Sequence, residues 1–232
     1  VAFEFAHVAA VGILPAPVID HLRRDFRMEL QAVDVGAHAE RLVAAAVGCQ
    51  VDQVLVASTG VIGVNLKMDS LRTGVPMAAA ALSPNGGADA AKAIMTTDPF
   101  PKDYAVEVQT VAGRFRVGGM AKGSGMIEPR MATMLGFITT DAKVAPAVLQ
   151  QALATACDAT FNAITVDGEC STNDCVFLMA SGASGVEITR ADDPEFLGAL
   201  IDVCGFLARE IVRGGEGATK LVEVRVTGAA TH

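Results

Sequence analysis

Residues 122–135, KGSGMIEPRMATML, place Thr133 between a glycine-rich loop and an apolar run. Threonine favours strands, so this position alone indicates a junction between a loop and a strand. A threonine is also a nucleophile when its own α-amino group serves as base, which requires the preceding peptide bond to be cut. An α-amine has an unperturbed pKa near ~8, close to working pH. The segment therefore leaves two interpretations open, a junction residue or a nucleophile uncovered by cleavage.

The sequence does not match other motifs of catalytic, nucleotide-binding or metal-binding sites, because the order or spacing of the residues differs. The four histidines lie near the chain ends, so no Ser/His/Asp set is indicated, and none of them clusters with cysteine at zinc spacing. In GGMAKGSG, Lys122 precedes Gly123 and Ser124, the reverse of the phosphate-loop order. The segment DGECSTNDC (167–175) lacks the EF-hand spacing and predicts a tight polar turn before a strand. We expect neither a nucleotide site nor a metal site.

The composition excludes further classes of protein. Apolar residues make up 51% of the 232 residues and charged residues 19%, which favours an α/β protein with a sizeable core. A net charge of −8 with scattered basic residues argues against a nucleic-acid partner. Five cysteines, an odd count without a Cys-x-x-Cys pair, indicate reduced thiols and a cytoplasmic location. The apolar opening carries Glu4, two prolines and no basic start, so we expect no signal peptide and no membrane span.

Periodicity and turn residues predict alternating helices and strands along the whole chain. The expected helices cover residues 35–47, 69–82, 86–96, 146–160 and 194–213. The expected strands cover residues 52–58, 104–111, 114–121, 133–142, 175–182 and 220–228. No linker, repeat or charge block divides these elements. We therefore expect a single α/β domain over residues 1–232, with antiparallel pairs as well as helical crossovers.

Five separated segments, in this order, resemble the ornithine acetyltransferases (bifunctional glutamate N-acetyltransferases) of arginine biosynthesis. They are LVASTGVIG (55–63), AIMTTD (93–98), GGMAKGSGMIEPRMATMLGFITTDA (118–142), FNAITVDGECSTND (161–174) and GGEGATKLVEV (214–224). The likeness runs from about residue 40 to the end. It implies the fold of that family, an α/β fold with mixed and antiparallel sheets packed against helices and a self-processing N-terminal threonine nucleophile.

The resemblance also assigns residues to roles. The family cuts the Ala–Thr bond of Met-Ala-Thr-Met-Leu, which implies cleavage at Ala132–Thr133 into an alpha chain, 1–132, and a beta chain, 133–232. Thr133 would be the nucleophile, with an oxyanion hole formed by Thr59 and Gly60. A Thr–Gly turn after a strand can aim a hydroxyl and a backbone N–H at one point, as a developing oxyanion requires. The implied substrate contacts are Thr96, Thr97, Lys122, Thr133 and Glu216.

The charges of two implied contacts suit an amino-acid substrate. Lys122 offers a point charge to a carboxylate, and Glu216 offers a carboxylate to an ammonium group. Without the resemblance, both residues would be interpreted as solvated surface charges, and Thr59 as a turn residue.

The implied reaction is a ping-pong transfer. Thr133 takes acetyl from N-acetylornithine and passes it to glutamate, with no cofactor; in bifunctional members acetyl-CoA is a second donor substrate. The implied assembly is a heterotetramer of two alpha and two beta chains.

The chain also departs from the family pattern. Arg130 stands where the family usually has Asn, residues 1–35 do not share the likeness, and the family's C-terminal part, which supplies an Asn and a Thr to the substrate site, lies beyond the match. We therefore expect weak or no turnover by this chain alone. Two alternatives stay open: an N-terminal-nucleophile aminopeptidase or amidase of related fold, in which water accepts the acyl group, and an inactive fragment that packs against partners.

Overall fold

The computed structural model describes residues 8–13, 30–60, 64, 66–128, 134–169, 171 and 173–228, with the backbone alone for 8–13 and 30–35. The helices are α2 (Leu30–Val47), α3 (Met68–Ala80), α4 (Gly87–Ala93), α5 (Pro146–Ala159) and α6 (Pro194–Arg213), with short 3-10 turns at Val51–Gln53 and Phe161–Ala163. The strands are β1 (Val8–Ile13), β2 (Val54–Thr59), β3 (Lys102–Thr110), β4 (Gly113–Lys122), β5 (Leu135–Thr140), β6 (Lys143–Val144), β7 (Cys175–Ala180) and β8 (Glu187–Ile188).

The main sheet has four strands in the order β3-β4-β5-β7. β3 and β4 form the hairpin that the sequence predicts, and β4 pairs with β5 in antiparallel register. β5 and β7 run parallel, connected through α5, because a parallel pair needs a crossover rather than a hairpin. The prediction of a mixed sheet packed against helices is confirmed.

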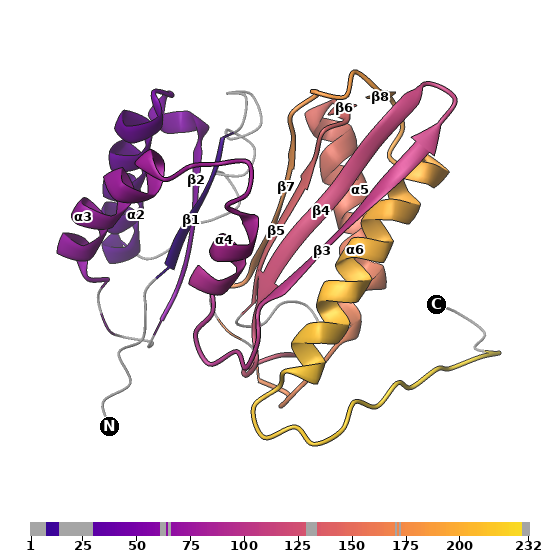
Figure 1. The fold of residues 1–232 in the computed structure, drawn as a ribbon. Coiled ribbons are helices and arrows are strands. Elements are labelled where there is room, and N and C mark those ends of the chain that lie inside the picture. The colour runs from indigo at the N-terminus through magenta and orange to yellow at the C-terminus, as the bar shows by residue number, and fades with distance from the viewer. Residues whose placement is uncertain are drawn as a thin grey trace.

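Helices α5 and α6 cover one face of this sheet (Figure 1). α6 begins after Asp193, whose carboxylate accepts the N–H of Phe196 at 2.9 Å and so caps the helix. Its apolar side chains recur at helical spacing and face the sheet, so this helix supplies much of the core. Five of them have no exposed surface: Phe196, Leu200, Val203, Leu207 and Ile211.

A second, two-stranded sheet pairs β1 with β2 in antiparallel register and packs with α2 and α3 (Figure 1). Ala57 of β2 and Ile94, next to α4, form a small apolar cluster with Leu135 and Phe137 of β5. This cluster joins the smaller sheet to the other face of the main sheet. The end of β2, where Thr59 lies, is therefore held close to the start of β5.

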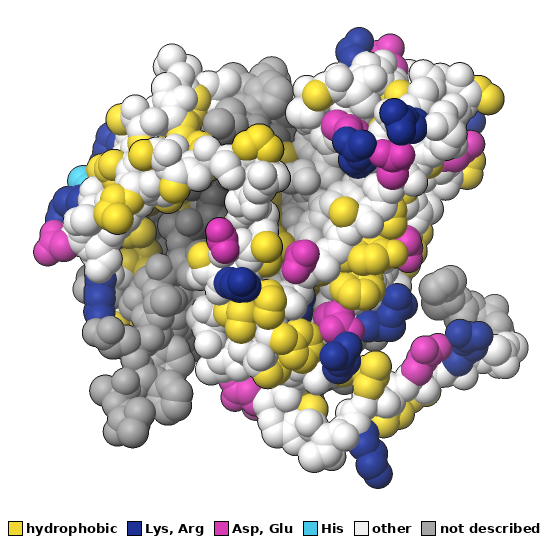
Figure 2. Space-filling view, in the orientation of Figure 1, with side chains coloured by type: hydrophobic (Ala, Val, Ile, Leu, Met, Phe, Trp, Pro, Cys, Tyr) yellow, Lys and Arg dark blue, Asp and Glu magenta, His cyan; other side chains and the backbone are white. Residues whose placement is uncertain are grey.

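The predicted strand at 220–228 is wrong. Residues 215–227 form neither a helix nor a strand in the structure and leave Val222, Val224 and Val226 exposed. Figure 2 shows this tail running away from the body of the protein with hydrophobic and charged side chains in the open. Alternating side chains suit a pleated strand, but a strand also needs a neighbouring ladder, and none of the described strands pairs with this segment.

Among the described residues, no helix is long and apolar enough to cross a membrane. In the same ranges, no group of three or more His, Cys, Asp or Glu side chains could hold a metal ion. The four cysteines within them are free thiols: Cys49, Cys157, Cys175 and Cys204.

Candidate active site

Strand register brings three chemically distinct segments to one end of the main sheet. Lys122, the last residue of β4, is the partner of Leu135, the first residue of β5. Leu135 is in turn the partner of Cys175, the first residue of β7. The loop after β4, the approach to β5 and the polar turn before β7 therefore meet at this edge. Thr133 precedes Leu135 by two residues in the chain and, with Ala132, lies outside the described residues.

Lys122 is a buried cation, not the solvated surface charge that its residue type alone indicates. Its residue exposure is 2%. Burial lowers the pKa of Lys122, and the positive charge of Lys102 acts in the same direction. The negative charges of Asp98, Asp174 and Glu216 oppose that shift. A buried ammonium group beside carboxylates is suited to a compact anionic group such as a substrate carboxylate.

Asp174 lies in the turn before β7, and its charge acts on Lys122. Its Oδ1 accepts the N–H of Met134, the residue that follows Thr133 in the chain, at 2.7 Å. Within the described part of the chain, Oδ2 is buried without a hydrogen-bond partner. Burial raises the pKa of Asp174 to about 6, although the Met134 N–H and the Lys122 charge act against the rise.

The turn at Thr96 and Thr97 is tied to the loop after β4. The Thr97 hydroxyl is 2.6 Å from the Ser124 hydroxyl, and the Thr96 N–H donates to Asp98 Oδ2 at 3.2 Å. Ser124 itself is 2% exposed. The Thr97–Ser124 bond thus joins the threonine pair to the loop that follows Lys122, a segment distant in sequence.

Glu216 reaches the same loop from the far end of α6. Its N–H donates to the carbonyl of Ser124 at 2.6 Å, while its side chain is exposed. A Cβ added at Gly125 would lie 3.2 Å from the Glu216 carboxyl carbon, so the glycine permits a close approach that a larger residue would crowd. Ser124 therefore contacts both Thr97 and Glu216.

A buried ion pair connects the turn that carries Thr96 and Thr97 to the start of β3. Lys102 Nζ is 2.5 Å from Asp98 Oδ1, and neither side chain is exposed. The same oxygen accepts the N–H of Gly123 at 2.8 Å, directly after Lys122. Burial alone would raise the pKa of Asp98, but the Gly123 N–H and Lys102 hold it below its ordinary value. The end of the Lys102 side chain also packs against Gly214, where α6 ends.

Thr59 is the last residue of β2, and Gly60 follows it. Thr59 is 5% exposed and Gly60 is exposed. The Asn173 amide donates to the carbonyl of Ser58 at 3.1 Å, so the turn that carries Asp174 is bound to the end of β2. The structure thus brings the candidate oxyanion turn and the approach to β5 into contact with one shared loop.

The segment 167–175, which the sequence predicts to be a tight polar turn, is hydrogen-bonded to the loop after β4. Both carboxylate oxygens of Asp167 accept backbone N–H groups, from Met126 at 2.6 Å and Ile127 at 2.8 Å. Burial alone would raise the pKa of Asp167, but these N–H groups keep it below its ordinary value. Met126 adopts a positive φ of 53°, and the hydrogen bonds to Asp167 hold this conformation in place.

The cysteines near the core are not suited to act as the nucleophile. Burial raises the pKa of the Cys157 thiol to about 11 and that of the Cys175 thiol to about 12. Burial also raises the pKa of Cys204. Because the thiolate is the reactive form, raised pKa values disfavour these three thiols as nucleophiles at neutral pH.

Comparison with known proteins identifies the family. The model of the ArgJ family matches residues 31–232. The arginine biosynthesis bifunctional protein ArgJ of Symbiobacterium thermophilum is 54% identical over 204 residues, which are 87% of this chain and 51% of that protein. The protein of the same name from a Synechococcus species is 55% identical over 181 residues, 77% of this chain and 44% of that protein. This chain belongs to the ArgJ family.

Similarity to other members of the ArgJ family is of the same order. The ArgJ protein of Thermosynechococcus vestitus is 50% identical over 197 residues, covering 82% of this chain and 46% of that protein. The chain spans about half the length of the curated relatives it matches. The resemblance inferred from the five sequence segments is thereby confirmed at the level of the family.

Within this ArgJ-family chain, the structure brings together those implied substrate contacts that lie among the described residues. Thr96, Thr97, Lys122 and Glu216 are linked through Ser124 and Asp98. Four residues of this cluster were not singled out from sequence: Asp98, Lys102, Ser124 and Asp174. Asp98, Ser124 and Asp174 do lie inside the matching segments, whereas Lys102 lies four residues beyond one of them.

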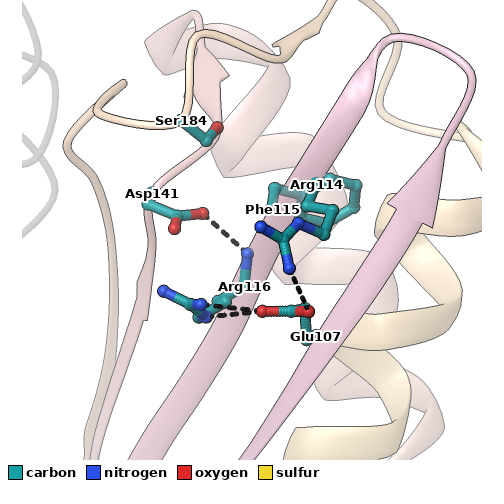
Figure 3. A pocket seen from close by; sticks show the side chains of 6 residues that line it. All are labelled: Glu107, Arg114, Phe115, Arg116, Asp141 and Ser184. Atoms are coloured by element: carbon teal, nitrogen blue, oxygen red, sulfur yellow. Dashed lines mark hydrogen bonds and ion pairs between the residues drawn. The ribbon is translucent and has the colours of Figure 1, made fainter.

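A separate hollow of about 340 Å³ lies at the opposite end of β4 and is not the candidate site (Figure 3). Its two arginines are already paired with one carboxylate: Arg116 contacts Glu107 at 2.7 Å and Arg114 contacts it at 3.4 Å. All three side chains are well exposed, so solvent screens these pairs. Arg116 precedes Lys122 by six residues, which separates the two sites by ~20 Å along an extended strand.

Proposed function

We propose that this chain carries the acyl-transfer site of an ArgJ-type acetyltransferase, which cleaves itself between Ala132 and Thr133 and then moves acetyl from N-acetylornithine to glutamate. Membership of the ArgJ family supports the reaction class. The observation that carries the proposal is the cluster of Lys122, the Thr97–Ser124 pair and Glu216 at the strand edge that follows Thr133. We place the activity in the cytoplasm and in arginine biosynthesis.

The proposed transfer has two balanced steps. In the first, the Thr133 α-amine accepts the hydroxyl proton while Oγ attacks the acetyl carbonyl carbon of N-acetylornithine. The C–N bond then breaks, and the ornithine amine leaves with that proton, so that an acetyl ester remains on Oγ. In the second, the amine of glutamate attacks the ester and its proton returns to Thr133. No cofactor enters this cycle, and acetyl-CoA would act as an alternative acetyl donor.

The described residues suit the recognition of an amino-acid substrate. Lys122, buried among carboxylates, would bind the α-carboxylate, and the exposed carboxyl of Glu216 would bind an ammonium group. Thr96 and Thr97 would add hydroxyl groups beside them. After cleavage, we expect the segments 1–132 and 133–232 to stay associated as alpha and beta chains, assembled as two of each.

The intact mass of the purified chain tests this proposal most directly. We expect two species under denaturing conditions, residues 1–132 and residues 133–232, that elute together under native conditions. N-terminal sequencing of the second species should begin at Thr133. A single uncut chain, or a new terminus at another residue, would overturn the proposed self-processing.

Thr59→Ala tests the proposed oxyanion hole. Removing one oxyanion donor costs about 10²–10³ in rate, so acetyl transfer from N-acetylornithine should fall by that factor in a full-length relative with the same Thr–Gly turn. Cleavage is expected to continue, because its oxyanion forms at the Ala132 carbonyl and not at the acetyl group. The rate of acetyl ester formation on the peptide that begins at Thr133 is the measurement. Folded, cleaved protein that transfers acetyl within about threefold of the unmodified enzyme, well short of the usual loss, would leave Thr59 as a turn residue only.

A further inference from the structure

The self-cleavage proposed above needs a base that the mature site does not need. Before cleavage, the Thr133 nitrogen is part of the peptide bond to Ala132, so it has no basic lone pair to take the hydroxyl proton. The α-amine becomes available only after that bond has been cut. A different group must therefore accept the proton in the first reaction.

Asp174 is a carboxylate bound to the residue that follows Thr133 in the chain. Its Oδ1 accepts the N–H of Met134 at 2.7 Å, and Met134 follows Thr133 directly. Consecutive Cα atoms lie ~3.8 Å apart, so this hydrogen bond anchors Asp174 one residue from the nucleophile. Its second oxygen, Oδ2, is buried and accepts no hydrogen bond from the described residues.

Two other carboxylates near this edge already accept hydrogen bonds on both oxygens. Both oxygens of Asp98 are taken, by Lys102 and Gly123 on one side and by Thr96 on the other. Asp167 uses both oxygens to bind two backbone N–H groups of the loop after β4. Glu216 is exposed to solvent. Asp174 is the carboxylate of this group that combines burial with an unoccupied oxygen.

The charged surroundings of Asp174 keep it available as a base. Of the described groups, those that act on it are the ammonium of Lys122, from the end of β4, and the Met134 N–H, from the approach to β5. The neighbouring thiol of Cys175, on β7, stays protonated because burial and the Asp174 charge raise its pKa. Burial raises the pKa of Asp174 itself to about 6, so the carboxylate is ionised at neutral pH and more basic than an exposed aspartate.

We propose that Asp174 is the proton acceptor for self-cleavage, a role that rests on the proposed function above. As Thr133 Oγ attacks the Ala132 carbonyl carbon, its proton passes to Asp174 Oδ2. The same proton is delivered to the Thr133 nitrogen as the bond between that nitrogen and the Ala132 carbon breaks, which leaves an ester between Ala132 and Oγ. Water then hydrolyses the ester, which produces the Ala132 carboxylate and restores the Thr133 hydroxyl.

Asp174→Asn separates this role from a structural one, because the amide oxygen still accepts the Met134 N–H while the basic oxygen is lost. A general base contributes about 10²–10⁴ in rate, so cleavage of the variant should slow by at least about a hundredfold. The chain is made by cell-free synthesis, and the uncut fraction is followed by mass spectrometry after synthesis is stopped. Asp174→Glu, which restores a carboxylate, should regain part of the rate.

The pH dependence of the unmodified chain supplies a second readout. Since the ionised carboxylate is the active form, the cleavage rate should rise with pH through an inflection near 6 and then level off. Asp174→Asn should remove that inflection. Asp141→Asn is the matched control, because Asp141 Oδ1 also accepts a backbone N–H, from Arg116 at 2.6 Å, at the remote end of the sheet. It should cleave like the unmodified chain.

The outcomes distinguish this inference from the function on which it rests. An unmodified chain that never cleaves would overturn the proposed self-processing and this inference with it. Cleavage of the unmodified chain together with an equal rate in Asp174→Asn would overturn the role of Asp174 alone. If circular dichroism shows that neither variant folds, a flat pH profile of the unmodified chain between about pH 5 and about pH 8 would overturn it equally.

Discussion

Thr133→Ala is expected to abolish both self-cleavage and acetyl ester formation, because it deletes the atom that attacks in each reaction. The variant should run as one intact chain at every time point, and peptide mapping should find no acetyl group on the peptide that contains residue 133. Thr139→Ala, on the exposed side of β5, is the matched control and should cleave normally, since its hydroxyl makes only a long contact of 3.4 Å with Gly118.

Two results would contradict the expected roles of Thr133. Cleavage between residues 132 and 133 in the alanine variant would show that another group, or a contaminating protease, cuts the chain. Acetyl found on a cysteine would contradict the transfer mechanism, since burial raises the pKa of three of the thiols far above neutral.

Asp98→Ala is expected to be the most destabilising single change in the candidate site. It leaves the ammonium of Lys102 buried without its partner, and breaking a buried ion pair in this way typically costs about 3–5 kcal/mol. It also removes the acceptor for the N–H of Gly123, next to Lys122. The free energy of unfolding from urea titration is the measurement. A double variant, Asp98→Ala with Lys102→Met, should recover part of the loss, because the unpaired charge is gone.

The pH dependence of this contribution follows from the direction of the pKa shift. The pKa of Asp98 is lower in the folded protein than the ordinary value of 3.8. Its contribution to stability is therefore fully present above that value and is lost as the pH falls through the lower, folded pKa. Asp69→Ala is the control, since Asp69 pairs with Arg72 at 2.6 Å on the exposed face of α3 and should leave the unfolding curve unchanged. Equal stability of Asp98→Ala and the unmodified chain would mean that the buried pair does not organise this region.

The sequence alone determined the elements whose signals are local. α6 was predicted with the bounds that the structure has, because Asp193 caps it and Gly214 ends it. α5 was predicted to within one residue, from Pro146 in its first turn. The hairpin of β3 and β4 followed from alternation on both sides of a short turn. Membership of the ArgJ family was likewise readable from segments such as the one around Thr133, since residue identity in order is itself sequence information.

Only the tertiary structure decided which of these elements have partners. The alternation at 220–228 resembles that of β3, yet β3 pairs with β4 and residues 220–228 pair with no described strand. A period of two residues records which side chains share a face; the ladder that makes a strand depends on a second segment that the pattern does not specify.

The candidate site was decided by tertiary structure for the same reason. The bonds from Asp174 to Met134 and from Asp98 to Gly123 join residues 40 and 25 positions apart. The burial of Lys122 follows from the register of β4 against β5, and no local pattern around a lysine predicts that it will lose contact with water. Sequence therefore named the residue types that the chemistry needs. Strand register and burial determined which of their charges interact and left Asp174 Oδ2 buried without a hydrogen bond from the described residues.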